Sequence, residues 1–573
     1  MCRLTYTDYL AAFHFGRIFL LVFLSLESDS GLLPPSMLRR MLYWCPGVAA
    51  ALWFFCLGLI FFRYPGFQND ELLFAATIFR RSASVYILQV GRGIPLMALS
   101  YLGTLKSFLW GPLLRHSVSE ATIRLPAVIL GAATVLFTYQ LVARMHSRRA
   151  AMVTACILAT DASFFLTTCF DWGPVALQHI LVVTGLLLLV RFAQAGGQGA
   201  LFLGFLAFGL GLWDKALFVW ILSGLGVACI VVYPRELLRR LSWRTVATAS
   251  LGFVLGASPL IVYNVAQPLA TFRSNSHFAF NDLAGKFRML RLTFGGAVLQ
   301  GYLTNLDNVS NPHGPSNELE TLSLQLHSLT GSHPTGYEEP AMLVALLLLP
   351  LLLLTHARRT LLFVLIAYVV AWVQMAITQT AGGAVHHTIL LWPLPVMFMG
   401  IAFAQASYAL GRAGPWLLAL VTLLIVSANV VVLNEYLYAF VRNGAQGVWS
   451  DAVRPLVKQI VDAQPRRVIV YDWGIAVPVE VMTKERVFPE WSDDPMFPPS
   501  ISEPERKFRR EKLEDTAAVW VGHTDGNEQF PGINARVAAS VRAAGFEKVP
   551  VSIVTDSHGR PMFQLFRLRK VEE

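Results

Sequence analysis

Residues 41–62 read MLYWCPGVAAALWFFCLGLIFF, and residues 69–79, just beyond them, read NDELLFAATIF. The first stretch carries no charged residue and is long enough to cross the hydrocarbon core of a bilayer as a helix. The second stretch begins with two adjacent carboxylates, Asp70 and Glu71. Because ionisable groups at a membrane are costly, they usually serve a function. This junction therefore predicts a membrane protein with polar chemistry at the end of its first span.

The composition on either side of this junction supports the same interpretation. Hydrophobic residues make up 55% of the chain and charged residues only 14%. A soluble protein carries about 25% charged residues, so most of this chain has no water-facing surface. Residues 440–573 differ, since they contain 19 basic and 19 acidic residues, and the whole net charge of +10 lies in residues 1–439. The excess arginine lies between apolar spans, which excludes nucleic-acid binding. The six cysteines form neither a disulfide framework nor a zinc pattern.

Apolar runs of about 20 residues predict eleven membrane spans. They lie near residues 41–62, 122–143, 150–168, 175–195, 199–213, 216–233, 245–266, 341–355, 360–378, 388–406 and 415–434, of which the fifth and the eighth are short. The arginine-rich short connections between these spans all fall on one side, which the positive-inside rule assigns to the cytoplasm. Residues 63–121, residues 267–340 and the chain after the last span are therefore predicted to lie outside.

The chain is expected to have three parts. Residues 1–36 are interpreted as an N-terminal extension that either lies on the membrane surface or is dispensable, and residues 37–439 as the transmembrane domain. Residues 440–573 are predicted to form a small extracytoplasmic α/β domain, because helical and strand patterns alternate there. The helical patterns cover residues 450–464 and 533–544, and the strand patterns cover residues 468–471, 517–521, 551–554 and 562–568.

The acidic pair after the first span is the leading candidate for a catalytic site. Asn69 is expected to cap the short helix, which places Asp70 and Glu71 in its first turn, where the helix dipole favours ionised acid. An ionised aspartate at the membrane surface is also what a general base for an acceptor hydroxyl requires. Helix capping alone remains the alternative interpretation.

Further charges lie at the predicted outer ends of other spans. Asp171 follows the third span on the same outer side as Asp70, and Asp161 lies deeper within that span. Two acids that converge from separate spans favour a site over an isolated structural acid. Lys215 lies at the outer junction of the fifth and sixth spans, where it suits a lipid phosphate, although Asp214 beside it offers a simple ion pair. The outer loop 63–121 is unusually basic. We expect Lys215, Arg92 and the other cations of this loop to form a positive rim that faces anionic headgroups. Arg92 is, with Lys215, a candidate ligand of a donor phosphate in this rim.

Two histidines and one tail motif complete the candidates. His386 and His387 open the tenth span, but adjacent helical residues point about 100° apart and make poor joint metal ligands. We expect one of them to orient a donor substrate and the other to be structural, with both structural as the alternative. The tail motif Tyr471-Asp472-Trp473-Gly474 is interpreted as a turn after a strand. No phosphate-binding glycine loop is present, which argues against an ATP-driven machine.

With these residues in place, residues 41–434 resemble the GT-C-fold glycosyltransferases that use polyprenyl-phosphate sugars, above all the protein O-mannosyltransferases and the lipid A aminoarabinose transferases. The resemblance rests on the order and common sidedness of four features, and on no single one of them. The features are the acidic pair Asp70-Glu71, the motif Ile123-Arg124-Leu125-Pro126 entering the second span, the acid Asp171 after the third span, and the segment Gly209-Leu-Gly-Leu-Trp-Asp-Lys215 before the sixth.

The resemblance implies an inverting transfer of a sugar from a polyprenyl-phosphate donor to an extracytoplasmic glycan, lipid or protein. It makes Asp70 the base, Glu71 its support, Asp171 a group that holds the acceptor or base, and Lys215 a ligand of the donor phosphate. His386 and His387 match only loosely, as substrate-binding candidates. The resemblance also implies that neither a cofactor nor a metal is needed, although oligosaccharyltransferases of the same fold use one. It implies a multi-pass protein of a bacterial cytoplasmic membrane, with its site outside.

Two other functional classes fit eleven spans. A transporter or flippase of lipid-linked or small substrates would show paired halves with broken spans, and the sequence shows no such halves. A non-catalytic assembly protein would bind partners through its tail. Substitution of Asp70 by asparagine separates these classes, because only a transferase should lose turnover while it keeps its fold.

Overall fold

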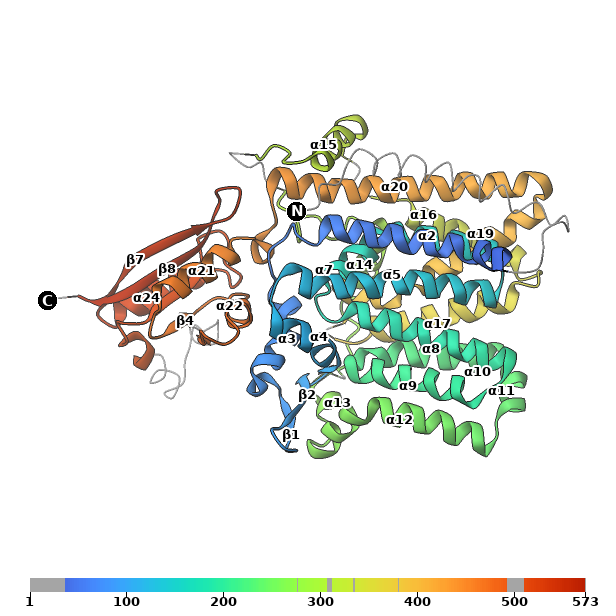
Figure 1. Ribbon diagram of the computed structural model, residues 1–573, viewed down its shortest axis with the longest axis horizontal. Helices are drawn as coiled ribbons and strands as arrows, with labels where there is room; N and C mark the ends of the chain where they lie inside the picture. The colour runs from blue at the N-terminus through green and yellow to red at the C-terminus, as the bar shows by residue number, and fades with distance from the viewer. Residues whose placement is uncertain are drawn as a thin grey trace.

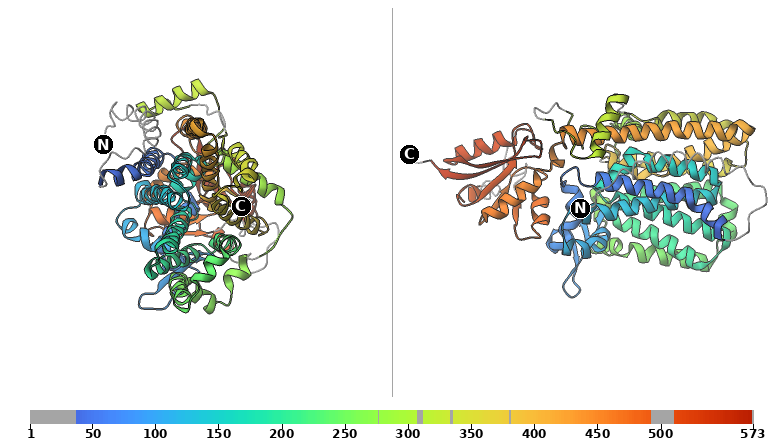
Figure 2. Two further views of the ribbon diagram at one scale, coloured as in Figure 1. Left: turned by 90° about the vertical axis from the view of Figure 1, so that its right-hand side faces the viewer. Right: turned by 45° about the horizontal axis from the view of Figure 1, so that its top comes forward.

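The structure is a computed structural model and describes residues 37–275, 277–306, 312–332, 335–379, 381–491 and 510–571. The predicted extension, residues 1–36, lies outside the described residues. Each of the eleven predicted spans falls on a helix or a bent helix pair. Figures 1 and 2 show these helices side by side, with their axes along the long direction of the molecule. They are α2 (Met37–Phe61), α5 (Glu120–Met145), α6 (Arg148–Thr160) with α7 (Ala162–Phe170), α8 (Val175–Ala195), α9 (Gln198–Asp214), α10 (Val219–Val232), α12 (Trp243–Ala266), α16 (Glu338–Leu352), α17 (Arg358–Ala376), α19 (Leu394–Ala409) and α20 (Gly414–Asn443).

Length and apolar composition support a multi-pass membrane protein. Within the described residues, six helices are long and apolar enough to cross a bilayer, and the number rises to nine if each of three bent pairs is one span. The bends are 58° between α6 and α7, 98° between α10 and α11 (Pro234–Arg240), and 45° before α19. The other two predicted spans are α9 and α16, which have only 17 and 15 residues. These are the two runs that the sequence already marks as short.

The segments between the spans gather at the two ends of this bundle. Figure 1 shows α3, α4, the small hairpin and α13 at the end that meets the tail, and α11 at the opposite end. The three segments predicted to lie outside thus have elements at the same end; which side of a membrane that end faces remains a prediction. The short elements between the spans, at either end, are α3 (Asn69–Phe79), η2 (Arg81–Ala83), β1 (Tyr86–Leu88), β2 (Ile94–Leu99), β3 (Leu102–Gly103), α4 (Leu105–His116), η3 (Ala216–Phe218), α13 (Ala270–Asn275), α14 (Leu283–Gly295), α15 (Glu318–Thr330), α18 (Val385–Thr388), η4 (Ile389–Leu391) and η5 (Gly411–Ala413).

The tail is a small α/β domain, as predicted. Its five-stranded sheet has the order β5-β4-β6-β8-β7, in which β4 runs parallel to β5 and β6, and β8 antiparallel to β6 and β7. The sequence patterns missed α22 and β5, and the predicted strand at residues 551–554 is the end of the longer β7. The elements are η6 (Gly447–Trp449), α21 (Val453–Ala463), β4 (Val468–Val470), α22 (Ala476–Met482), β5 (Pro489–Trp491), β6 (Val519–His523), α24 (Ile533–Ala543), β7 (Phe546–Thr555) and β8 (Pro561–Lys570).

The tail packs directly against the start of α3. Helix α22 contacts α3, and the backbone N–H of Gly66 donates to the carbonyl of Trp449 at 2.6 Å. A Cβ at Gly66 would lie 2.1 Å from the carbonyl oxygen of Ser450, so only glycine fits this approach. The segment that leads into the acidic pair is therefore fixed between the bundle and the tail.

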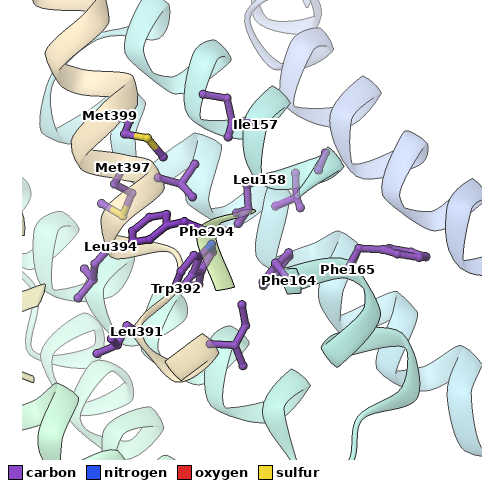
Figure 3. Close-up of a cluster of buried hydrophobic side chains, with 14 of the residues drawn as sticks. Ile157, Leu158, Phe164, Phe165, Phe294, Leu391, Trp392, Leu394, Met397 and Met399 are labelled. Carbon is purple, nitrogen blue, oxygen red and sulfur yellow. The ribbon is translucent and has the colours of Figure 1, made fainter. Parts of the chain in front are cut away.

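The interior of the bundle is apolar around the break between α6 and α7 (Figure 3). Trp392 packs on Phe294 with ring centroids 5.0 Å apart, and its indole N–H donates to Asp161 at 2.5 Å. The other carboxylate oxygen of Asp161 accepts from the backbone N–H of Phe164 and caps α7. Asp161 thus provides a hydrogen-bond acceptor for the backbone where the helix breaks inside the core. It lies at the opposite end of α7 from Asp171.

Candidate functional site

The helix that carries the acidic pair begins one residue earlier than the sequence suggests. Gln68, and not Asn69, is the N-cap of α3, because its side-chain oxygen accepts from the backbone N–H groups of Asp70 (2.6 Å) and Glu71 (3.1 Å). The Asn69 amide instead donates to Asp70 Oδ1 at 3.1 Å. Asp70 remains half-buried in the first turn, where the helix dipole stabilises its charge. The expected cap residue was wrong, but the expected placement of Asp70 at the helix start is seen.

Glu71 lies in the interior and pairs with Arg124 of α5. The guanidinium reaches both carboxylate oxygens, at 2.5 and 2.8 Å, and both side chains are fully buried. The remaining N–H groups of Arg124 donate to the carbonyls of Phe62, Pro65 and Gly66. Burial raises the pKa of Glu71, and the charge and hydrogen bonds of Arg124 oppose that rise. The pair ties α5 to the turn before α3, so Glu71 can support Asp70 only through the backbone.

Asp171 lies at the end of α7 and forms a second buried pair. Lys106 Nζ of α4 is 2.6 Å from Asp171 Oδ2, and the two side chains are only 2% and 3% exposed. The other oxygen of Asp171 accepts from the backbone N–H of Ala176 at the start of α8. Lys106 also lies over the Phe74 ring, 4.1 Å from its centroid. Lys106 is one of the loop cations that the sequence predicts for the rim, and its place in the apolar run Leu105–Trp110 is the one local signal for this buried role.

Lys215 is buried at the end of α9 and donates to the carbonyl of Gly173 at 3.0 Å. Asp214 accepts from Gln178 instead, at 2.9 Å, and no ion pair within the described residues joins Asp214 to Lys215. The alternative of a simple pair between these neighbours is therefore not seen. The Lys215 ammonium lies within electrostatic reach of the carboxylates of Asp70, Asp171 and Asp214.

The segment after Asp171 brings the histidines to this lysine. Trp172 Nε1 donates to His386 Nδ1 at 3.2 Å. Gly173 has φ +81°, and a Cβ there would lie 3.4 Å from Lys215 Nζ and 4.0 Å from the His386 ring. The positive φ favours glycine at this position, whereas a Cβ would make only ordinary van der Waals contacts. His387 is half-buried beside His386, and its Nδ1 has no hydrogen-bond partner within the described residues.

We call the group formed by Asp70, Asp171, Lys215 and His386 the centre. Aromatic side chains line it on the side of the tail. Trp172, Tyr302 and Trp449 contact one another with ring centroids 5.3 to 6.2 Å apart. Burial raises the pKa of Tyr302 to about 12, and the negative charge of Asp70 adds to this rise. Burial also raises the pKa of Tyr101, again with a contribution from Asp70. Both tyrosines therefore lie within electrostatic reach of Asp70. They were not candidates from the sequence, since no local pattern marks them.

Arg92 is the candidate that the structure does not bring to this centre. It lies exposed at the tip of the hairpin between β1 and β2, and its carbonyl accepts from the Arg81 guanidinium. No contact with Lys215 is found for it within the described ranges. Lys106, another cation of this loop, pairs with Asp171 inside the protein, so it does not belong to a positive rim either. In the described parts of the chain, no three His, Cys, Asp or Glu side chains gather as a metal site.

Comparisons with known proteins agree with this architecture. The model of the dolichyl-phosphate-mannose-protein mannosyltransferases matches residues 110–263. The structure of ArnT from Cupriavidus metallidurans bound to undecaprenyl phosphate is similar, with a TM-score of 0.56 and 12% identity over 91% of this chain and 97% of that chain. The apo oligosaccharyltransferase of Archaeoglobus fulgidus has a TM-score of 0.50 and 13% identity over 94% of this chain and 75% of that one. No curated protein sequence matches. The resemblance stated from the sequence is thus confirmed, and the chain has the GT-C fold.

Proposed function

We propose that the protein is a membrane glycosyltransferase that moves a sugar from a polyprenyl phosphate to a hydroxyl of an extracytoplasmic glycan, lipid or protein. One observation carries this proposal: Asp70, a half-buried carboxylate, lies within electrostatic reach of Lys215, which converges with His386 on Gly173. A displacement at a sugar phosphate needs a base for the acceptor and fixed positive charge for the leaving group. This centre provides both.

Asp70 acts as the base in this proposal. It accepts the proton of the acceptor hydroxyl while the acceptor oxygen attacks the anomeric carbon. The new carbon–oxygen bond forms as the bond between that carbon and the phosphate oxygen breaks, so the configuration inverts. Polyprenyl phosphate leaves with the electron pair. The backbone N–H groups that Gln68 caps fix Asp70 at the start of α3, which limits the reorganisation needed in the reaction.

Lys215 receives the leaving phosphate, with His387 as a second ligand. The ammonium is held near Gly173 by one carbonyl bond, which leaves other N–H groups for the phosphate oxygens. The uncommitted Nδ1 of His387 can add a hydrogen bond, while His386 is positioned by Trp172. Arg92, exposed on the hairpin, is assigned to anionic headgroups and not to the reacting phosphate.

Asp171 and Glu71 have supporting roles. Lys106 pairs with Asp171 next to Trp172 and Gly173, from where Asp171 holds the acceptor or orients the base. Glu71 positions α3 through Arg124. Because the leaving phosphate already carries charge and meets fixed cations, the proposed reaction needs no metal. Turnover is expected to survive EDTA. Loss with EDTA and recovery with manganese would reassign Asp70 and Asp171 as metal ligands.

A donor panel tests this function directly. Purified full-length protein in lipid nanodiscs is incubated with undecaprenyl-phosphate and dolichyl-phosphate sugars and a cell-envelope extract, and released polyprenyl phosphate is followed by mass spectrometry. Release is expected for at least one donor, and Lys215→Ala should weaken binding of that donor. If every donor stays intact while fluorescent lipid crosses liposomes that contain the protein, the chain is a transporter and the proposal is wrong.

A further inference from the structure

A polar cleft of about 250 Å³ lies at the junction of the bundle and the tail, and Asp70 and Lys215 are not among its lining residues. The turn after α2 contributes Arg63 and Tyr64, and the tail contributes Asp451 and His558. The remaining walls come from the segment before α15 and from the end of α20. Figures 1 and 2 show α15 near the end of α20 that approaches the tail.

The carboxylates and guanidiniums of this cleft balance in charge, and one of each is already engaged. Its carboxylates are Glu320 and Asp451, and its guanidiniums are Arg63 and Arg454. Glu320 accepts from the hydroxyl of Tyr64 and from Ser316, and Arg454 pairs with Glu120 at 2.6 Å.

Two groups in the cleft keep binding capacity. Arg63 is exposed and has no carboxylate partner within the described residues. Asp451 uses only Oδ1, which accepts from the N–H of Ser557 at 3.2 Å, and its other oxygen has no partner in the described ranges. A guanidinium and a carboxylate oxygen together offer several donors and one acceptor without a net charge. That set suits vicinal hydroxyl groups better than an anion, which the carboxylate would repel.

Rings stiffen two walls of the cleft. Tyr64 stacks on Phe440 with centroids 6.0 Å apart and an interplanar angle of 13°. His558 stacks on His313 at 4.3 Å, and its Nε2 bonds to the carbonyl of Val441. Rigid ring faces next to a few convergent polar groups are the usual lining of a small-ligand site. Apolar faces of a pyranose ring can pack on such rings, while its hydroxyl groups meet the polar atoms.

We propose that this cleft binds a neutral sugar residue of a glycan, apart from the centre around Asp70. One short segment connects the two sites: Thr304 pairs with Ala445 of the cleft, and Tyr302, two residues earlier, contacts Trp172. A glycan held in the cleft is thus close to the centre without occupying it. The inference rests on the chemistry of the cleft and stands whether or not Asp70 transfers a sugar.

Saturation-transfer NMR on the full-length protein tests this inference. The protein is placed in nanodiscs, since maltoside detergents would compete, and is probed with mannobiose, chitobiose, lactose and inorganic phosphate. At least one neutral disaccharide should bind, and the double variant Arg63→Gln with Asp451→Asn should weaken that binding about tenfold or more. The matched control, Arg291→Gln with Glu339→Gln, removes an exposed outer pair and should leave binding unchanged.

A second variant separates this site from the transfer centre. Asp70→Asn should bind the disaccharide as the wild type does, and melting temperatures confirm that each variant is folded. The inference is overturned if no neutral disaccharide binds, if only phosphate binds, or if the folded double variant binds normally. It is equally overturned if Asp70→Asn abolishes binding, because the sugar would then occupy the centre.

Discussion

Two buried ion pairs at the same end of the bundle look alike in sequence and differ in what surrounds them. Glu71–Arg124 and Asp171–Lys106 each join a carboxylate to a cation, and no partner is more than 3% exposed. Arg124 makes five hydrogen bonds, two to Glu71 and three to backbone carbonyls of the turn before α3. This pair is enclosed by protein and fixes a turn.

The Asp171–Lys106 pair lies next to residues that contact the centre. Trp172 and Gly173, the next two residues, contact His386 and Lys215, and the charge of Asp171 acts on Lys215. Burial and ion pairing therefore do not identify a catalytic group by themselves. The difference lies in the remaining contacts of each pair: Arg124 donates to the backbone carbonyls of a turn, whereas the charge of Asp171 acts on Lys215.

The largest effect is expected for the enclosed pair. Arg124→Gln leaves Glu71 buried without its cation and three carbonyls without a donor, which should cost about 3–5 kcal/mol of stability. Melting temperature and monodispersity in detergent measure this loss. If Arg124→Gln melts like the wild type and only its turnover is reduced, Arg124 takes part in the reaction. The two ion pairs would then not differ in role.

For the Asp171–Lys106 pair, removal of both charges should lower turnover and leave stability almost unchanged. Lys106→Met with Asp171→Asn leaves no isolated buried charge, so stability should remain close to that of the wild type. Turnover should fall roughly 10–100-fold, the scale of one lost charged hydrogen bond. Each single variant should be less stable than the double variant. Full turnover in the folded double variant would make this pair structural as well.

A smaller effect is expected where Trp172 orients His386. Trp172→Phe keeps a ring in place but removes the N–H donor, which should lower turnover about threefold to tenfold. His386→Ala combined with Trp172→Phe should cost little more than His386→Ala alone, because the two residues act through one hydrogen bond. Additive losses in this double-mutant cycle would show that Trp172 acts independently of His386.

The smallest effect belongs to an exposed pair in the tail, Arg467–Glu490. Hydrogen bonding to Arg467 lowers the pKa of Glu490 to about 2 from an unfolded value near 4.5. The stabilisation is therefore fully present above about pH 4.5 and is lost as the pH falls toward 2. Because Glu490 is 38% exposed, solvent screening limits it to under about 1 kcal/mol.

Melting temperatures of the wild type and Arg467→Gln between pH 6 and pH 3 test this prediction. The difference between the two proteins should shrink as the medium becomes more acidic. A difference that grows at low pH would contradict the assigned direction of the pKa shift.

The sequence predicted the spans and the position of Asp70, because apolar length and first-turn acids are local signals. It also predicted the α/β tail, but not the three-residue strand β5 or the seven-residue helix α22, which are too short to show a period. Most contacts within the site could not be predicted from the sequence. Lys106 meets Asp171 across 65 residues and Trp172 meets His386 across 214. No spacing rule encodes such distances, so Lys106 was assigned to the rim and Tyr302 was missed.

The central claim, that Asp70 is the base of a sugar transfer, is tested most directly by single-turnover kinetics of Asp70→Asn against Asp282→Asn, an exposed acid of the outer segment. Release of polyprenyl phosphate should slow roughly 10²–10⁴-fold in Asp70→Asn, with donor binding and melting temperature close to the wild type. Asp282→Asn should react at the wild-type rate. A folded Asp70→Asn protein that releases polyprenyl phosphate at the wild-type rate would contradict the account and leave Asp70 as a residue of the helix start.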